Sequence, residues 1–398
     1  MADASIALPT QDFRHLIAIA TMPLERRSSI PILSMVRCRA NGSFEVTGTD
    51  LDITVSAKFD HGGGPEGSFM LAKPRSVAEA ARGTGAHSVE LTLGDSELGV
   101  TAGALTMKVG NLPPVDDFPS LGEMAHETFT STMSHAQLRS LHRIAASVST
   151  EETRYYLNGI YLHQIAGTHF RAAATNGHRL SVIDLELPDA RGELPGIIIP
   201  RKSLRLMLAL AGKPSPKDEG LRLAVGGINA PNRTASTAPE RSAAQTRMSM
   251  QIRAGKVDVC LATKLIDGTY PDYQRVIPQP GESTKTFVFE SAELRRAISA
   301  LSHVVTDEAR GVKVSFDTEG ALLSAQILDV ALSSSIRVGC QHKHAGFEVG
   351  FNGGYLLSMI DAAGPGELVL SLDDPVAPAL MRNPADTAWN GVLMPMRV

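Results

Sequence analysis

The order of apolar and polar residues predicts three short amphipathic helices that start in the same way. The segments are 8–20 (LPTQDFRHLIAIA), 133–145 (MSHAQLRSLHRIA) and 289–301 (FESAELRRAISAL). In each, a Ser/Thr-type N-cap region and a polar pair precede apolar residues at steps of three and four. We therefore expect a capped amphipathic helix in each segment.

A second pattern follows each of these helices. An apolar strand, a turn and a helix closed by Gly are predicted in segments 69–83 (FMLAKPRSVAEAARG), 197–212 (IIIPRKSLRLMLALAG) and 349–364 (VGFNGGYLLSMIDAAG). Pro74 and Pro200 are 126 residues apart, and Leu8 and Met133 are 125 apart. Because the two offsets agree, the chain contains an internal repeat.

Alternating apolar and polar residues fill the space between the helices and predict half-buried antiparallel strands. Such stretches are 44–59, 170–187 and 321–338, and further strands follow each second helix at 88–110, 220–227 and 367–381. Each repeat is therefore predicted to consist of a helix, a group of strands, a second helix and a second group of strands. The prediction is an α+β protein of three domains, 1–126, 127–277 and 278–398, with linkers rich in Pro, Gly and acidic residues near 113–128 and 277–285.

The second repeat carries an additional segment, about 228–256, rich in Ala, Ser, Thr and Arg. Few large apolar residues occur in it, so an exposed, mobile insertion is expected. A long hairpin loop and an arm that contacts DNA or a partner are the two alternatives.

Composition sets further limits. A chain of 398 residues exceeds one ordinary domain. It has no apolar stretch long enough to span a membrane, and its start lacks a signal-peptide pattern. Three widely spaced cysteines without a CxxC pair argue against disulfides and a zinc site. We expect a cytoplasmic protein without cofactor or metal.

Charge is distributed unevenly along the chain. The six predicted helical stretches carry a formal charge of +8, whereas the whole chain carries −4, so the remainder carries −12. Helices facing one surface would present a positive lining for phosphate contacts that do not depend on base sequence. The alternative is that the helices carry Lys and Arg on ordinary solvated faces.

Five segments in order resemble the bacterial DNA polymerase III beta subunit, the beta sliding clamp or DNA polymerase processivity factor: 154–162 (RYYLNGIYL), 174–182 (ATNGHRLSV), 197–204 (IIIPRKSL), 264–278 (KLIDGTYPDYQRVIP) and 392–398 (VLMPMRV). The first repeat matches through 29–33, 49–52 and 117–121. The resemblance implies three clamp domains with helices on one face and antiparallel sheets on the other. It also implies a head-to-tail homodimeric ring around double-stranded DNA, which serves DNA replication without catalysis.

The resemblance implies three sets of site residues. The DNA-facing positions are Arg27, Arg75, Arg82, Arg201, Lys202 and, in preference to Tyr155, Tyr156. Met107 and Val109 would meet His303 and Val304 of a second copy across the dimer interface. The third set is a groove for a short peptide motif of DNA polymerase subunits, the clamp loader and repair proteins, formed by Leu157, Thr175, Gly177, His178, Arg179, Leu180, Pro271, Arg275, Val276, Asn352, Tyr355, Val376, Met394, Pro395, Met396 and Arg397.

The groove is chemically reasonable, since Met gives an adaptable apolar wall and Arg and His at a rim orient a peptide. From the residues alone, Met394 and Met396 also fit an ordinary core. Several positions depart from the family pattern: Ala309 replaces an aromatic residue, Asn176 replaces Asp, Pro378 lies in the groove wall and His303 replaces an aliphatic residue. A specialised accessory clamp paralogue is therefore an alternative to the replicative clamp.

Two other classes of function find less support in the sequence. His178 with Arg179 resembles a reactive pair, and Asp50 with Asp52, expected on one strand face, could bind a divalent ion. No GxSxG, P-loop, HExxH or GxGxxG motif accompanies them, so an enzyme is not expected. A sequence-specific DNA-binding protein would need a recognition helix with base-reading side chains, whereas the charge here is spread over several helices.

Overall fold

The computed structural model describes residues 4–25, 27–60, 66–93, 97–121, 124–213, 220–228, 246–303, 311–327 and 332–397. They pack as two compact units. Unit 1 comprises 1–135, 189–194 and 202–265, and unit 2 comprises 136–188, 195–201 and 266–398. Among the described helices, none has the length and apolar character that a bilayer span requires.

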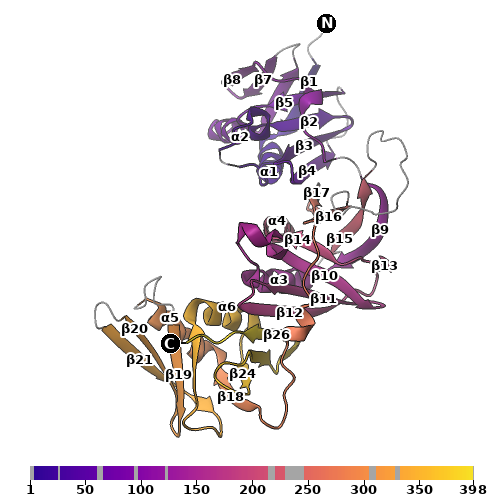
Figure 1. The fold of residues 1–398 in the computed structure, drawn as a ribbon. Coiled ribbons are helices and arrows are strands. Elements are labelled where there is room, and N and C mark those ends of the chain that lie inside the picture. The colour runs from indigo at the N-terminus through magenta and orange to yellow at the C-terminus, as the bar shows by residue number, and fades with distance from the viewer. Residues whose placement is uncertain are drawn as a thin grey trace. The chain divides into compact units, whose positions relative to one another are not determined.

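Unit 1 contains two antiparallel sheets (Figure 1). The four-stranded sheet has the order β1 (Ala4–Pro9), β6 (Ser88–Leu93), β7 (Glu97–Ala102), β8 (Leu105–Gly110). The nine-stranded sheet has the order β13 (Arg191–Gly192), β9 (Met124–Met133), β15 (Leu221–Ile228), β16 (Thr246–Ala254), β17 (Val257–Lys264), β4 (Ile53–Asp60), β3 (Ser43–Thr49), β2 (Val36–Ala40), β5 (Gly67–Leu71). Its helices are α1 (Thr10–Ala20), α2 (Pro74–Gly83) and, from its second residue, α4 (Arg201–Ala211).

Unit 2 repeats this composition. Its nine-stranded sheet has the order β14 (Ile197–Pro200), β10 (Gly159–Ala166), β11 (His169–Thr175), β12 (Arg179–Glu186), β26 (Asp386–Leu393), β25 (Ala379–Asn383), β24 (Glu367–Leu372), β18 (Lys285–Glu290), β22 (Cys340–Gln341). Its four-stranded sheet has the order β21 (Leu332–Val338), β20 (Gly320–Ile327), β19 (Gly311–Asp317), β23 (Glu348–Asn352). Its helices are α3 (His135–Ile144) from its second residue, α5 (Ser291–Ser302) and α6 (Gly353–Ala363).

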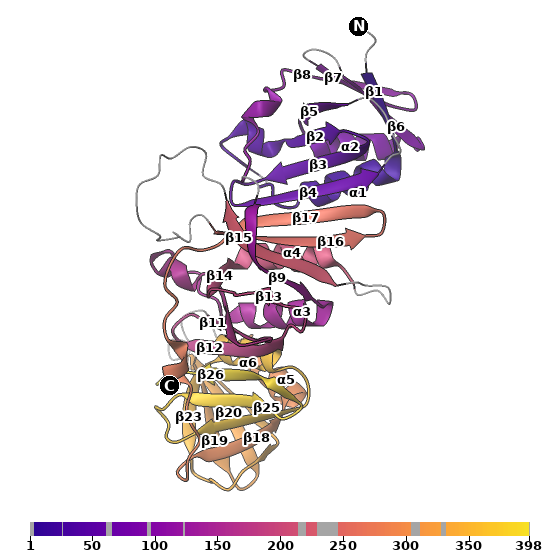
Figure 2. The same cartoon turned by 90° about the vertical axis from the view of Figure 1, so that its right-hand side faces the viewer.

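Each nine-stranded sheet joins strands of two neighbouring sequence repeats. In unit 1, β4 of the first repeat pairs antiparallel with β17 of the second, with Ile53 opposite Thr263 and Phe59 opposite Val257 (Figure 2). In unit 2, β12 of the second repeat pairs in the same way with β26 of the third. Because these hydrogen-bonded ladders cross the repeat boundaries, the packing units do not follow the repeats.

All six helices predicted from the apolar pattern are present, and their apolar faces are buried, as Phe13, Leu16 and Ile17 of α1 illustrate. The predicted Ser/Thr caps are wrong for two of them. Helix α1 starts after Pro9 with no side-chain cap, and the carboxylate of Glu290 caps α5 by accepting a hydrogen bond from the Glu293 amide at 2.8 Å. At the start of α1, the fixed φ of Pro9 takes the place of a hydroxyl cap. At the start of α5, the longer side chain of Glu290 does so.

Two predicted irregular segments are shorter than expected. Strand β9 occupies the second part of the linker predicted at 113–128, and β16 occupies 246–254 of the predicted insertion. The side chains of Met248 and Met250 are buried, because alternation along β16 places both on the core face of the sheet. The remainder of the insertion, 229–245, lies outside the described residues.

Candidate functional site

The apolar chain end is held by main-chain hydrogen bonds within unit 2. After β26, the Met394 amide donates to the His178 carbonyl at 2.9 Å, and the Met396 amide donates to the Gly350 carbonyl at 2.8 Å. The terminal segment thereby connects the β11–β12 turn to β23. Met394 and Met396 remain 39% and 40% exposed, so their alternative assignment to an ordinary core is wrong.

The turn between β11 and β12 is fixed by its own side chains. The Asn176 amide oxygen accepts hydrogen bonds from the backbone amides of His178 and Arg179 at 3.0 and 3.1 Å, and Gly177 adopts a φ of 88° that favours glycine. The Thr175 hydroxyl donates to the Arg179 carbonyl at 2.8 Å. Asn176 therefore supplies the acceptor that an Asp would supply, and the turn presents His178 and Arg179 together.

The ring of Tyr355 on α6 contacts both of these side chains. The Arg179 guanidinium lies over its ring at 4.6 Å from the centroid, and the His178 ring stacks on it at 6.0 Å with a 20° interplanar angle. Arg179 also donates to the Ser358 hydroxyl and the Ala146 carbonyl. Burial lowers the pKa of Arg179 from its ordinary value. Asn352 caps α6 by accepting from the Tyr355 amide at 3.0 Å, which fixes the start of the helix that carries the ring.

The floor beneath this turn is a buried apolar cluster. Leu157 and Leu180 belong to it, together with Val392 of β26. The segment 264–278 packs on the same cluster through Tyr273, whose hydroxyl lies 2.8 Å from Nε2 of His163. It leaves Pro271, Arg275 and Val276 exposed, and Arg275 pairs with Asp272 at 2.7 Å.

An open cavity of about 480 Å³ adjoins the terminal segment. Four predicted groove residues line it: Val376, Pro395, Met396 and Arg397. Val376 is 71% exposed, which is unusual for an aliphatic side chain, and Pro378 beside it is half-buried. Every predicted groove residue belongs to unit 2, so the apolar wall, the aromatic ring and the cationic rim lie in one compact body.

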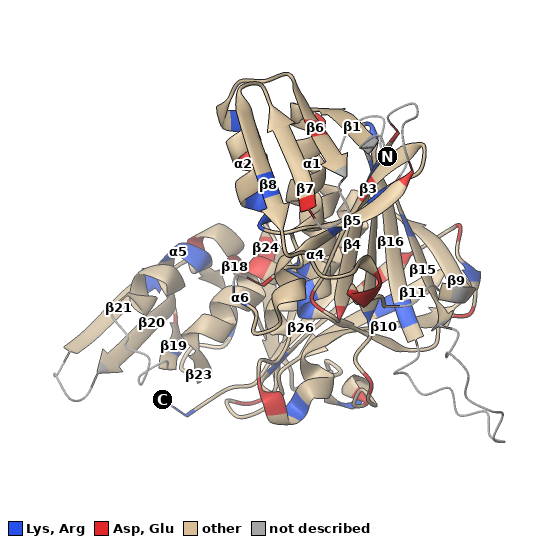
Figure 3. Ribbon diagram, turned by 90° about the horizontal axis from the view of Figure 1, so that it is seen from above, with Lys and Arg blue, Asp and Glu red and all other residues tan. Residues whose placement is uncertain are grey.

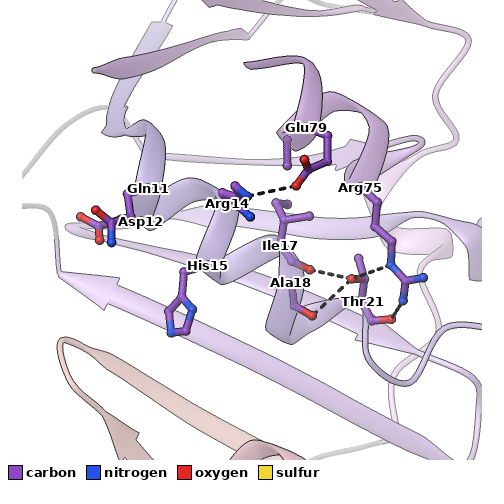
Figure 4. A pocket seen from close by; sticks show the side chains of 10 residues that line it. Gln11, Asp12, Arg14, His15, Ile17, Ala18, Thr21, Arg75 and Glu79 are labelled. Carbon is purple, nitrogen blue, oxygen red and sulfur yellow. Dashed lines mark hydrogen bonds and ion pairs between the residues drawn. The ribbon is translucent and has the colours of Figure 1, made fainter. Parts of the chain in front are cut away.

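The predicted DNA-facing residues of the first repeat differ in how they are held. Arg27 is exposed in the loop after α1. Arg75 donates from Nε and Nη2 to the hydroxyl and carbonyl of Thr21 at 3.0 and 2.6 Å, and so caps the carboxyl end of α1 (Figure 4). Arg82 pairs with Glu79 at 2.8 Å.

Arg201 and Lys202 are adjacent but differ in environment. Arg201 is exposed. Burial is the main cause that lowers the pKa of His142, and the positive charge of Arg201 lowers it further. Lys202 pairs with Asp50. The expectation that Asp50 and Asp52 share a strand face is wrong. Both lie in the turn between β3 and β4, where the Asp50 carboxylate accepts from the Asp52 and Ile53 amides.

Tyr155 and Tyr156 form an edge-to-face pair at the end of the short helix η4 (Glu152–Leu157), with ring centroids 5.8 Å apart. Tyr155 is 55% exposed, whereas Tyr156 packs partly against the buried cluster. The accessible ring is therefore that of Tyr155, although the sequence favoured Tyr156.

The predicted dimer residues lie near sheet edges. Met107 and Val109 are half-buried on β8, the edge strand of the four-stranded sheet of unit 1. His303 is exposed directly after α5, and α5 packs on β21, an edge strand of unit 2. Val304 and Ala309 lie outside the described residues. Within the described ranges, no group of three or more His, Cys, Asp or Glu residues is placed to hold a metal ion.

Family models and solved structures give a consistent comparison. The model for the central domain of the DNA polymerase III beta subunit matches residues 132–272, and that for the C-terminal domain matches 274–397. The beta sliding clamp of Proteus mirabilis is 30% identical over 383 residues, covering 94% of this chain and 95% of its own length. That of Caulobacter vibrioides strain NA1000 is 29% identical over 394 residues, with the same coverage.

Two solved structures share the fold over nearly their full length. A sliding clamp from Bartonella birtlesii bound to griselimycin is 28% identical with a TM-score of 0.83, covering 99% of this chain and 100% of its own. A Caulobacter crescentus beta sliding clamp, with polyethylene glycol in a proposed beta-motif tethering region, is 26% identical with a TM-score of 0.82, covering 100% and 99%. The chain therefore belongs to the beta sliding clamp family, the beta subunits of DNA polymerase III.

Proposed function

We propose that this chain acts as a DNA sliding clamp, a non-catalytic processivity factor that encircles duplex DNA and tethers a polymerase to it in the cytoplasm. Three domains, 1–126, 127–277 and 278–398, would form half of a ring made by two copies. The observation that carries this proposal is the repeated way in which sheets join from one repeat to the next.

In the described chain, four strands lie between the two helices of the first repeat and five between those of the second and third, and three strands follow each second helix before the next repeat begins. The third strand between the two helices joins the last strand of the next repeat: β4 pairs with β17, and β12 pairs with β26. The same rule leaves β21 of the third repeat and β8 of the first as edge strands in the described chain. A second copy that applies the rule again pairs its β8 with β21, head to tail.

Ring closure follows from this rule, because two copies joined twice leave neither edge free. Each contact would merge two four-stranded sheets into one of eight strands, comparable to the nine-stranded sheets within the chain. Edge strands with apolar side chains tend to pair with other chains. Met107 and Val109 on β8 and the exposed Leu332 on β21 fit that requirement, and His303 would border the contact.

The helical face would contact DNA through exposed cations such as Arg27 and Arg201, with Arg75, Arg82, Lys202 and the Tyr155–Tyr156 pair as further candidates. Contacts of this kind are weak, independent of base sequence and sensitive to salt, which suits a ring that slides. A topologically closed ring needs no tight binding to remain on a circle.

Partner proteins, among them DNA polymerase subunits, the clamp loader and repair proteins, would insert a short peptide into the groove of unit 2. Its exposed Met394, Met396 and Val376 offer apolar contacts, and Arg179, His178 and Arg397 offer polar ones. The polyethylene glycol in the tethering region of the Caulobacter crescentus relative supports a groove that accepts an extended ligand.

Solution mass and retention on circular DNA test the proposal together. We expect a mass near twice 42.3 kDa, and protein that stays on a closed circle after loading until the circle is cut. Replacing Met107 and Val109 with Asp should yield monomers that are no longer retained, whereas Lys108→Gln on the same strand should leave the mass unchanged. A wild-type monomer that binds circles and linear DNA alike would refute the ring.

A further inference from the structure

The first helices of the three repeats carry an arginine at the same position. Aligned from Leu8, Met133 and Phe289, the seventh residue is Arg14, Arg139 or Arg295. Each is exposed on its helix, α1, α3 or α5. The same backbone position thus offers a cation three times, and its surroundings decide how much positive charge each repeat presents.

The second helices also share a pattern, two buried residues followed by an exposed charged one. The charged residue is Glu79 after Val77–Ala78 in α2, Arg205 after Ser203–Leu204 in α4, and Asp361 after Met359–Ile360 in α6. Two residues later, each helix has another buried position. The position is therefore acidic in the first and third repeats and basic in the second.

The acids neutralise the equivalent arginines in the outer repeats. Arg14 Nε lies 3.0 Å from Glu79 Oε1, and Arg82 takes the other carboxylate oxygen, beside an open groove of about 640 Å³ between α1 and α2 (Figure 4). In unit 2, Arg295 Nε lies 2.6 Å from Asp361 Oδ1. Hydrogen bonding to Arg14 is the main cause that lowers the pKa of Glu79, so this carboxylate stays charged.

The second repeat lacks this neutralisation. In the part of the chain that the structure describes, neither Arg139 nor Arg205 makes an ion pair or a side-chain hydrogen bond. Figure 3 shows Lys and Arg segments on α4 and on α5. Arg295 of α5 is held in an ion pair with Asp361, whereas Arg205 of α4 has no such pair among the described residues. α5 keeps one further exposed arginine, Arg296.

We propose that Arg139 and Arg205 of the second repeat are principal phosphate contacts of the helical face, and that Glu79 and Asp361 withhold Arg14 and Arg295 from this role. A phosphate that binds Arg14 or Arg295 must displace a carboxylate already in place, whereas one that binds Arg139 or Arg205 displaces only water and counterions. The contact with DNA is then concentrated on the middle repeat. This inference rests on the proposed function.

Salt titration of full-length protein on a short duplex, followed by fluorescence anisotropy, tests the proposal. Each lost phosphate contact reduces the slope of log K against log salt by about 0.9. We expect Arg139→Gln with Arg205→Gln to reduce the slope by about 2. Lys58→Gln with Lys256→Gln removes the same charge from exposed strand and turn positions and should leave the slope nearly unchanged.

The reciprocal variant releases the withheld arginines. Glu79→Gln with Asp361→Asn should increase the slope by about 2 to 3, since Glu79 also pairs with Arg82, and should strengthen binding at low salt. Glu90→Gln with Glu367→Gln, an equal charge change on exposed strand positions, should not. Equal slopes for each variant pair and its control would overturn the inference. Wild-type protein that is lost from an uncut circle would instead overturn the sliding-clamp proposal.

Discussion

The predicted groove of unit 2 and the predicted DNA-facing cations differ in how their side chains are held. In the groove, Arg179 is fixed by Tyr355, Ser358 and Ala146, and the terminal segment is hydrogen-bonded at both ends. Among the predicted DNA-facing residues, Arg201 is exposed without an acidic partner in the described part of the chain. A preorganised apolar groove suits recognition of a particular peptide, whereas exposed cations without acidic partners suit a uniform phosphate backbone.

Deleting Met394 to Val398 should have the largest effect, because it removes one wall of the predicted groove. The deletion removes two exposed methionines and the hydrogen bonds to His178 and Gly350, so binding of a polymerase-derived peptide should weaken by about 100-fold or more. Peptide titration by fluorescence anisotropy measures this loss. DNA retention and solution mass should not change, and unaltered peptide affinity would refute the groove assignment.

Arg179→Ala should have the next largest effect. It removes the cation over the Tyr355 ring and two hydrogen bonds, so peptide affinity should fall about tenfold and the free energy of unfolding by about 1–3 kcal/mol. Calorimetry and denaturant unfolding give the two values.

Arg275→Ala is the matched control for Arg179→Ala. The Arg275 side chain is 84% exposed and pairs only with Asp272 among the described residues, so its removal should change stability by less than about 0.5 kcal/mol. Similar losses of stability for both variants would mean that the rim is not preorganised.

The smallest effect separates two neighbouring cations on α4. Arg201→Gln should weaken DNA binding about threefold at about 0.1 M salt, since one phosphate contact is lost. Lys202→Gln should mainly reduce stability, because it leaves the 7% exposed side chain of Asp50 without its cation. Anisotropy with a duplex and thermal unfolding distinguish the two, and a larger DNA defect for Lys202→Gln would contradict their separation.

Much of the local structure could be predicted from the sequence. Apolar spacing located all six helices, and the agreement of two offsets revealed the repeat, because a helix or strand must turn its apolar face to a core. Apolar and polar residues also alternate along β16, and Met248 and Met250 are buried on its core face. The prediction of an exposed insertion, which used composition alone, was therefore wrong for these two residues.

Side-chain partners distant in sequence were much harder to predict. Arg75, Arg82 and Lys202 carry the same charge, yet Arg75 is hydrogen-bonded to Thr21, whereas Arg82 and Lys202 form ion pairs with Glu79 and Asp50. The sequence analysis did not single out Arg139 and Arg205, the phosphate contacts proposed above, although the arginine shared by the three first helices was a usable signal for Arg139.

The sequence by itself determined the repeat, the six helices, the α+β class and the excess of positive charge on the helices, because periodicity and formal charge are properties of neighbouring residues. Only the tertiary structure decided which arginines are neutralised, that Tyr155 is more accessible than Tyr156, and that sheets continue from one repeat into the next. Ion pairs, exposure and strand ladders depend on residues far apart in the chain, and folding alone brings those residues together.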